Sequence, residues 1–285
     1  MARARRRLLI LGMLAALLPA WPTGAQDFAG PGPAAAIGEY AGEPAGGAGV
    51  KLISGVPCYF WYNGCGPTSS GMIIGYWDAH GYSNLIPGSN DWVANEQAVK
   101  DMIASPGHIR DYVPTRNRTP TPEDPWHAND CVADWFQCSK NPDNYGWAYF
   151  SYADDSLRDY AIYRGYTTSA VYNLMYASSL WDTFTAAIDN NHPVEFLVDS
   201  DGNGSTDHFV AAVGYDNTPG AYRYACWDTW YATVRWCDYK ALGGGAWGVY
   251  GGTFFNPAPE PASLMLLGAG AFALLRRRRL AAGRG

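Results

Sequence analysis

Residues 55–82 read GVPCYFWYNGCGPTSSGMIIGYWDAHGY and set Cys65 on a glycine-rich turn directly before a helical pattern. One apolar face from about residue 68 to residue 77 is expected to pack against the core. A thiol at a helix start lies at the positive end of the helix dipole, beside main-chain N–H groups that lack helical partners. Both favour the nucleophilic thiolate, so Cys65 is predicted as a nucleophile, with one half of a disulfide as the alternative. The apolar side chains of this face are Met72, Ile73, Tyr76 and Trp77.

A second pattern, far downstream, changes from helical spacing to alternation. Residues 207–216 read DHFVAAVGYD and alternate like a strand that begins at His208, and the next strand-like stretch, CWDTW, contains Asp228. A cysteine at a helix start, a histidine on a strand and an acid on the neighbouring strand are the components of a thiol acyl-transfer site. We therefore expect Cys65 as the nucleophile, His208 as the base and Asp228 as the residue that orients the imidazole. Asp216 is the alternative acid.

Together the two motifs resemble the C39-like branch of papain-like cysteine peptidases, whose helix reads close to CGPTAAMxxGYW and whose histidine strand reads HxVxxxGYD. The likeness covers roughly residues 55–255. It implies an α+β, papain-like fold in which an N-terminal helical part, with the nucleophile helix, packs on a C-terminal antiparallel sheet. It also implies that the chain hydrolyses amide bonds of a peptide or protein substrate.

One position departs from the pattern that this resemblance implies. Papain-like enzymes usually place a glutamine about six residues before the nucleophile, where it donates a hydrogen bond to the developing oxyanion. Tyr59 occupies that position here, and no glutamine lies between Lys51 and Cys65. We expect the main-chain N–H of Cys65 to supply one donor, and the Tyr59 hydroxyl or the Asn63 amide to supply the other.

Helical patterns precede strand patterns along the chain, which is an α+β order. Helices are expected at residues 91–103, 131–138, 156–163 and 179–188, and strands at residues 194–198, 209–213, 222–227 and 233–236. The last of these helices is expected to open on a capping box formed by Ser179 and Asp182.

The stretch DSDGNGSTD at residues 199–207 has oxygen-bearing side chains at positions 1, 3, 5 and 9 of an EF-hand-type loop and glycine at position 6. Position 12 is Val210 in place of the bidentate glutamate. The loop is a candidate calcium site, with a plain turn between two strands as the alternative, and no other cofactor is required. The candidate ligands are Asp199, Asp201, Asn203 and Asp207.

Both ends of the chain carry export signals. Residues 1–25 combine arginines, an apolar run and a small-residue cleavage site, as a secretory signal peptide does. Residues 26–50 are rich in Ala, Gly and Pro and are predicted as a flexible linker, followed by one peptidase-like domain at residues 51–256. Signal peptidase is therefore an expected partner.

The C-terminal tail, residues 257–285, has three parts. A Pro-Glu-Pro motif formed by Pro259, Glu260 and Pro261 precedes an apolar stretch at 262–275 and a block of four arginines. This order resembles the PEP-CTERM sorting tail, which the membrane protease exosortase cuts in Gram-negative bacteria that make exopolysaccharide. We expect transient anchoring in the inner membrane and then release to the cell surface, the matrix or the medium, with a permanent membrane anchor as the alternative.

Charge and cysteine content narrow the function classes. Without the signal peptide and tail, 11 Lys and Arg face 25 Asp and Glu, a net charge of −14, so nucleic acid is excluded as a partner. Two alternatives to a peptidase stay open: an inert papain-like domain that binds peptide or exopolysaccharide, and a wall-peptide amidase or transglutaminase. The pairing of the other cysteines also stays open; they are Cys58, Cys131, Cys138, Cys226 and Cys237.

Overall fold

The computed structural model of the 285-residue chain describes residues 39–47, 49–88, 96–110, 127–139 and 145–258. The expected signal peptide and the sorting tail, with Pro259, Glu260 and Pro261, lie outside these residues. No helix within the described ranges is long and apolar enough to cross a membrane.

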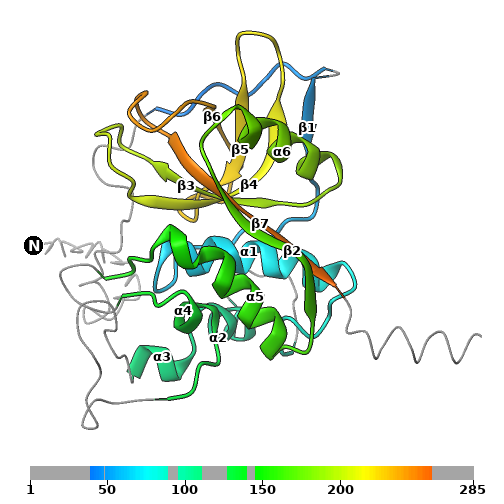
Figure 1. Ribbon diagram of the computed structural model, residues 1–285, viewed down its shortest axis with the longest axis vertical. Helices are drawn as coiled ribbons and strands as arrows, with labels where there is room; N and C mark the ends of the chain where they lie inside the picture. Colours follow the sequence, from blue (N-terminus) through cyan, green and yellow to red (C-terminus); the bar gives the residue numbers. More distant parts are fainter. Residues whose placement is uncertain (1–38, 48, 89–95, 111–126, 140–144, 259–285) are drawn as a thin grey trace, which may run out of the picture.

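A helical layer and a sheet layer make up the described part of the chain, with the helices in the lower half of Figure 1 and most strands in the upper half. The helical layer contains α1 (Cys65–Ala79), α2 (Gln97–Ile103), α3 (Pro106–Arg110), α4 (Val132–Trp135), the 3₁₀ turn η2 (Phe150–Tyr152) and α5 (Ala153–Tyr163). A further helix, α6 (Ser178–Asp189), lies with the sheet layer.

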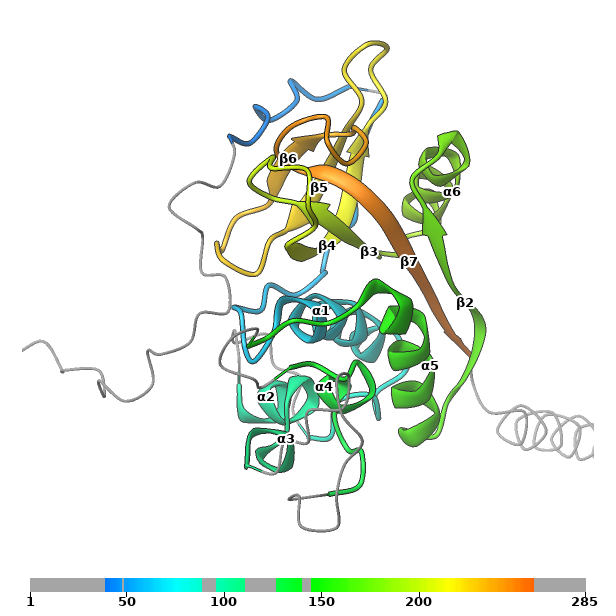
Figure 2. The same cartoon turned by 60° about the vertical axis from the view of Figure 1, so that its left-hand side comes forward.

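The sheet is antiparallel throughout, with the order β2-β7-β3-β4-β5-β6 and with β1 paired to β4. In Figure 2 the long strand β7 curves from the sheet layer towards the helical layer, with β2 beside it. The expected α+β class is confirmed. The strands are β1 (Val50–Leu52), β2 (Thr167–Met175), β3 (Val194–Asp199), β4 (His208–Asp216), β5 (Arg223–Trp227), β6 (Arg235–Asp238) and β7 (Gly248–Ala258).

Alternation along β3 places α1 and α6 on opposite faces of the sheet. Glu195 accepts hydrogen bonds from Ser69 and Ser70 of α1, whereas its neighbour Phe196 packs on Phe184 of α6 with ring centroids 4.8 Å apart. Because successive side chains of a strand point to opposite faces, the two helices sandwich the centre of the sheet. The start of α1 is thereby fixed against the strands that carry the second sequence motif.

Helix α1 is buried on every side, from Cys65 through Asp78, and not on one apolar face as expected. Small residues on its other faces permit this close packing. A Cβ atom at Gly71 would lie 2.8 Å from the side chain of Ile103, and one at Gly75 would collide with the Tyr59 hydroxyl. The glycines and serines of the motif therefore carry as much packing information as its apolar residues.

Most of the expected elements are present, but β2 and β7, which pair with each other at one edge of the sheet, were not predicted. β2 lacks a strict apolar alternation, and β7 contains Gly251, Gly252 and Pro257, which are typical of turns. A Cβ atom at Gly251 would lie 2.7 Å from the Phe150 ring, so the glycine there serves close packing. The expected capping box at Ser179 is wrong, because α6 begins at Ser178 with Ala177 as its N-cap and no side-chain cap.

Part of the expected linker is packed against the sheet. Tyr40 stacks on Trp247 with ring centroids 4.7 Å apart, and Ala41 pairs with Trp236 in an isolated β-bridge. Arg223 donates a hydrogen bond to the Gly42 carbonyl at 3.1 Å. An aromatic ring in an otherwise small-residue segment is enough to dock it, so residues 39–47 do not behave as a free linker.

Candidate active site

Cys65 is the first residue of α1, and the two residues before it make the turn that presents its thiol. Asn63 and Gly64 have φ values of 55° and 146°, and a Cβ atom at Gly64 would lie 3.0 Å from the carbonyl oxygen of Gly146. Only glycine satisfies both the backbone conformation and the close approach. Cys65 as a whole is 4% exposed.

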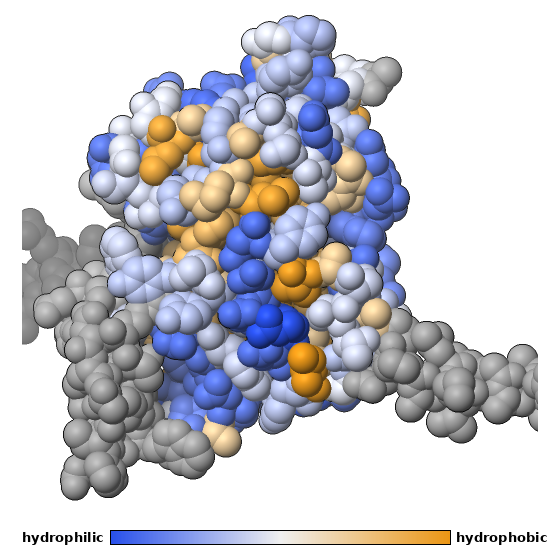
Figure 3. All heavy atoms as spheres, viewed as in Figure 1, coloured by the Kyte–Doolittle hydropathy of each residue, from blue (hydrophilic) through white to orange (hydrophobic). Residues whose placement is uncertain are grey.

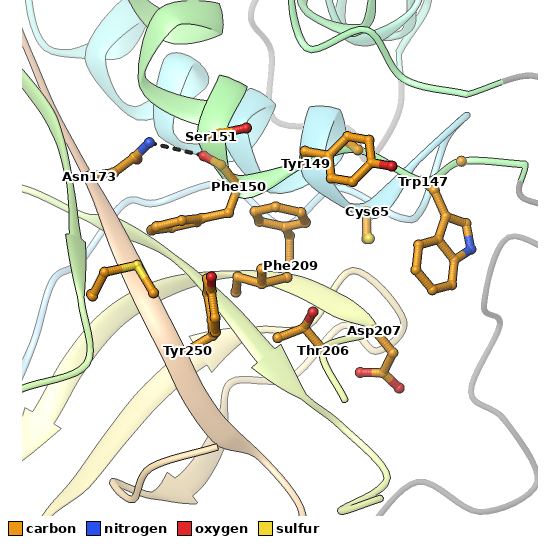
Figure 4. Close-up of a pocket in the computed structure, with 14 residues that line it drawn as sticks. Cys65, Trp147, Tyr149, Phe150, Ser151, Asn173, Thr206, Asp207, Phe209 and Tyr250 are labelled. Carbon is orange, nitrogen blue, oxygen red and sulfur yellow. Dashed lines mark hydrogen bonds between the residues drawn. The ribbon is translucent and has the colours of Figure 1, made fainter. Parts of the chain in front are cut away.

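The Cys65 side chain borders a cavity of about 520 Å³ between the helical layer and the sheet (Figure 4). Its sulfur points towards the side where Thr206 and Asp207 lead into β4. On the face seen in Figure 3, apolar surface gathers in the middle, where the two layers meet. The cavity is largely aromatic and apolar, and its further lining includes Trp147, Tyr149, Phe150, Met175, Phe209 and Tyr250.

In this closed environment Cys65 rests as a thiol. Burial raises the pKa of Cys65 to about 12, the negative charges of Asp207 and Glu195 add to the rise, and the main-chain N–H groups of Phe209 and Gly66 offset part of it by hydrogen bonding to the sulfur. The expectation that the helix start alone favours the thiolate is therefore outweighed by desolvation. Activation requires a base next to the thiol or a change in solvation when a substrate enters.

His208 is fully buried at the start of β4, and its ring stacks on Trp230 with centroids 3.8 Å apart. Burial lowers the pKa of His208 to about 4, so the imidazole is neutral near pH 7. Nε2 lies 2.7 Å from the main-chain carbonyl oxygen of Asp228. A carbonyl only accepts, so Nε2 carries the proton and Nδ1 carries the lone pair. Nδ1 is buried and has no hydrogen-bond partner among the described residues.

The structure brings the starts of α1 and β4 together. The thiol of Cys65 receives the N–H of Phe209 and lies in the field of Asp207, and these two residues flank His208 in the chain. Among the described residues, however, no hydrogen bond joins the imidazole to the sulfur. Phe209, which pairs with Leu197, lines the cavity beside Cys65, whereas His208, which pairs with Val198, points to the other face of the sheet and does not line the cavity. The thiol and the imidazole are therefore not engaged in proton transfer in this state.

Asp228 contacts His208 through its backbone and not through its carboxylate. Oδ1 accepts the N–H groups of Trp230 and Tyr231, both at 2.9 Å, and Oδ2 accepts the Tyr40 hydroxyl at 2.7 Å. The carboxylate thus caps the turn after β5. Asp228 thus contacts the imidazole as expected, but through its main-chain carbonyl and not through its carboxylate.

The alternative acid, Asp216, lies at the opposite end of β4 from His208. Its carboxylate accepts hydrogen bonds from the main-chain N–H and the hydroxyl of Thr218, at 2.9 and 2.6 Å. Asp216 therefore closes a turn and does not reach the imidazole.

Neither expected oxyanion donor faces Cys65. The Tyr59 hydroxyl contacts Gly75, ten residues or about 15 Å along α1 from the thiol. The Asn63 side chain accepts a hydrogen bond from the Tyr145 hydroxyl through Oδ1 and is hydrogen-bonded to Tyr62, which fixes it in the wall of the turn. The assignment of Tyr59 is wrong because the segment before Cys65 runs back alongside α1 and places the Tyr59 ring next to Gly75. A residue six positions before Cys65 in the sequence is therefore not close to its thiol.

In the loop of the candidate calcium site, carboxylates hydrogen-bond to the loop itself. Asp199 accepts the N–H groups of Gly202 and Gly204, both at 2.7 Å, and Asp207 accepts the N–H and the hydroxyl of Ser200, both at 2.7 Å. Asp201 bonds to Asn203 in the same way. Within the described ranges these carboxylates do not form a convergent ligand group. The calcium site stays a prediction.

One buried acid behind the helix start was missed. Glu195 of β3 accepts hydrogen bonds from Ser69 and Ser70 and is completely buried. Burial raises its pKa to about 8, so it is mostly protonated near pH 7. An acid inside the otherwise apolar stretch VEFLV was the available signal in the sequence.

The six cysteines are free thiols, and two of them adjoin: the Cys226 thiol is hydrogen-bonded to Cys237 across β5 and β6.

Two family models match the chain. The model of the Peptidase_C39 like family matches residues 53–253, and the model of the PEP-CTERM protein-sorting motif matches residues 257–279. Both resemblances noted in the sequence are thereby confirmed. No curated protein matches the chain.

Proposed function

The chain belongs to the Peptidase_C39 like family, and we propose that it is a cysteine peptidase in which Cys65, His208 and Asp228 form the catalytic group. The PEP-CTERM sorting motif implies that exosortase processes the chain during its export. The geometry that supports the proposal best is a thiol at a helix start, on the wall of a cavity, beside the strand that carries a neutral histidine. These are the parts that amide hydrolysis by a thiol requires.

The tautomer of His208 suits a general base. Since Nε2–H donates to the Asp228 carbonyl, Nδ1 carries the lone pair that is to take the proton from the Cys65 thiol. This step requires a rearrangement, on substrate binding, that brings the imidazole from its stack on Trp230 to the thiol. The resulting thiolate attacks the carbonyl carbon of the amide, and the C–N bond breaks as Nδ1 returns the proton to the leaving amine. Water then hydrolyses the thioester with the same base, which regenerates the thiol.

Asp228 is proposed as a positioning residue. Its main-chain carbonyl fixes the ring tautomer, while Trp230 holds the ring plane by stacking. Its carboxylate, bonded to the turn and to Tyr40, fixes the position of that carbonyl. This differs from a triad in which the carboxylate itself bonds to the imidazole.

Oxyanion stabilisation is the part of the site with the least support. The N–H of Cys65 lies at the start of α1, where helical partners are lacking, and serves as one donor. Tyr59 and Asn63 are turned to other partners. This observation favours a second candidate function, an inert domain that binds peptide in the aromatic cavity without cleaving it.

Localisation beyond export is also proposed. Cleavage near Pro259 by exosortase would release the domain to the cell surface or to the exopolysaccharide matrix. Intact mass measurement of the exported form checks this, because a chain that retains the arginines after residue 275 contradicts it.

Alkylation at pH 6 separates the peptidase from the inert domain. A cysteine-peptidase activity probe, followed by peptide mapping, should label Cys65 faster than Cys58, a half-buried thiol that does not line the cavity and donates to the Tyr231 carbonyl. His208→Ala should slow the labelling of Cys65 at least tenfold, whereas Cys58→Ser, the matched control, should leave it unchanged. Equal labelling of the two thiols, unaffected by His208→Ala, would support the inert domain.

A further inference from the structure

A second group of cysteine, histidine and aspartate side chains lies in the helical layer. His108 of α3, Cys131 directly before α4 and Asp134 of α4 each offer one donor atom, and the three atoms lie within 4.8 Å of one another. Nδ1 of His108 is 2.8 Å from Oδ1 of Asp134, and Sγ of Cys131 is 3.2 Å from Oδ2. None of the three lines the cavity beside Cys65.

The group is closed off from solvent. His108 is 3% exposed, Cys131 is fully buried and the Asp134 side chain is 6% exposed. His127 reaches the same carboxylate from the solvent side, with Nε2 3.2 Å from both of its oxygens and a side chain that is 19% exposed. A buried site with one accessible edge is thus already assembled around Asp134.

The donor types and spacings are those of a zinc site. Zinc binds thiolate sulfur, imidazole nitrogen and carboxylate oxygen at 2.0–2.3 Å in a tetrahedron, which places neighbouring donors about 3–4 Å apart. Cys131 and Asp134 are separated by two residues, and His127 and Cys131 by three, in the range of short ligand spacings.

The charges of the proposed ligands fit a divalent cation such as zinc. Among the proposed ligands, one thiolate and one carboxylate neutralise a divalent cation, while the two imidazoles bind as neutral ligands. Asp130, a further carboxylate near His127 and Asp134, is exposed to solvent and is not needed for this balance. A neutral assembly avoids the cost of burying a net charge. Calcium and magnesium prefer oxygen ligands only, so a sulfur and two nitrogens disfavour them.

We propose that His108, Cys131 and Asp134 form a structural zinc site, with His127 in reach of the fourth position. Binding releases the thiol proton of Cys131 to solvent, and the proton that His108 Nδ1 shares with Asp134 moves to Nε2, so that the imidazole stays neutral. Zinc would tie α3 to α4 and so brace the two described segments on either side of residues 111–126.

Metal analysis of the exported chain, purified under reducing conditions, tests the proposal. We expect about one zinc per chain after reconstitution and dialysis. In the cobalt-substituted protein we expect the visible bands of a four-coordinate ion and a near-ultraviolet band from thiolate-to-cobalt charge transfer. Cys131→Ser should remove the charge-transfer band and weaken zinc binding at least about 100-fold.

Cys58→Ser is the matched control, because it removes a thiol outside the group and should preserve both the stoichiometry and the cobalt spectrum. The wild-type spectrum decides the question even if Cys131→Ser fails to fold. Absence of bound zinc and of the charge-transfer band in the wild type would overturn the proposal and leave Asp134 as a helix cap that hydrogen-bonds to two histidines. Unchanged zinc affinity in a folded Cys131→Ser would overturn it as well.

Discussion

Two groups in this molecule use the same three residue types and differ in where the carboxylate points. In the helical layer, Asp134 lies at the centre: it accepts the main-chain N–H groups of Asp130 and Cys131, and the side chains of His108 and Cys131 converge on it as well. In the group that includes Cys65 and His208, the Asp228 carboxylate points away from the imidazole, to main-chain N–H groups and to Tyr40.

The residue types in a group do not by themselves define its chemistry. Convergent donors suit an ion, because one cation satisfies them all. A thiol on the wall of a cavity suits a reaction, because a substrate that enters the cavity can reach it. The first group lies in a closed interior, and in the second group Cys65 borders the cavity while His208 and Asp228 are buried behind it.

Removing the thiol of the cavity group should give the largest effect. Cys65→Ala should lower the hydrolysis rate of a casein-type substrate at least about 10³-fold, because no covalent intermediate forms. The same variant should keep the zinc content and the melting temperature of the wild type. Full activity in Cys65→Ala would refute the peptidase mechanism. Loss of zinc in the same variant would show that Cys65 contributes to zinc binding, so that the two groups are not independent.

The ionisation of buried groups near the cavity should make the free energy of unfolding depend on pH. The neutral Glu195 contributes stability that is present below pH 4.5 and is lost as the pH rises to about 8, a change of about 5 kcal/mol at most. Glu195→Gln should therefore be stabilised relative to the wild type at pH 8 and not at pH 4.5. Urea midpoints at the two pH values measure this, and parallel curves for the two proteins would show that Glu195 titrates normally.

His208 has the opposite effect on the pH dependence of stability, and its effect falls in a lower pH range. Its contribution is present above pH 6.5 and is lost as the pH falls to about 4, a change of about 3 kcal/mol at most. His208→Gln should remove this acid sensitivity. An unchanged slope of stability between pH 4 and 6.5 would mean that the imidazole is solvated.

The role of the Asp228 carboxylate can be tested by an isosteric change. Asp228→Asn keeps the main-chain carbonyl that bonds to His208, so we expect kcat to fall by less than about tenfold, against about 10⁴-fold where the carboxylate itself sets the tautomer. Steady-state kinetics with a peptide substrate measure this. A loss of kcat near 10⁴-fold would show that the Asp228 carboxylate itself bonds to the imidazole in the active state.

The smallest effect is expected at the loop of residues 199–207. If calcium binds there with a millimolar dissociation constant, 10 mM calcium should stabilise the domain by about 1.4 kcal/mol, or roughly 3–6 °C in melting temperature. Asp201→Ala should abolish the shift. A chelator specific for calcium keeps the zinc group out of the measurement, and no shift with either change would leave the loop a plain turn.

The helix start and the strand with its histidine could be predicted because each depends on local pattern. Cys65 follows a glycine turn, and His208 opens an alternating strand, so the positions of both backbones follow from spacing. The α+β order is likewise a matter of sequence order. These predictions needed no knowledge of which side chains meet.

Side-chain partners could not be predicted, since they depend on contacts between distant segments. Tyr40 and Asp228 lie 188 residues apart, and their hydrogen bond redirects a carboxylate that the sequence assigned to His208. Tyr59 was assigned by counting back from Cys65, although its ring packs far along α1. The zinc group joins residues 108, 131 and 134, and only the last two are close in sequence.

The docked segment at residues 39–47 sets the minimal unit for protein engineering. A recombinant chain that starts at residue 50 would lose the Tyr40 ring from the face of Trp247 and the hydroxyl from the Asp228 carboxylate. A buried carboxylate oxygen left without its donor costs about 1–3 kcal/mol, a large share of the stability of one domain. A recombinant chain for expression or crystallisation should therefore start before residue 39. Its first residues then lie in a stretch whose composition alone would have suggested removing it.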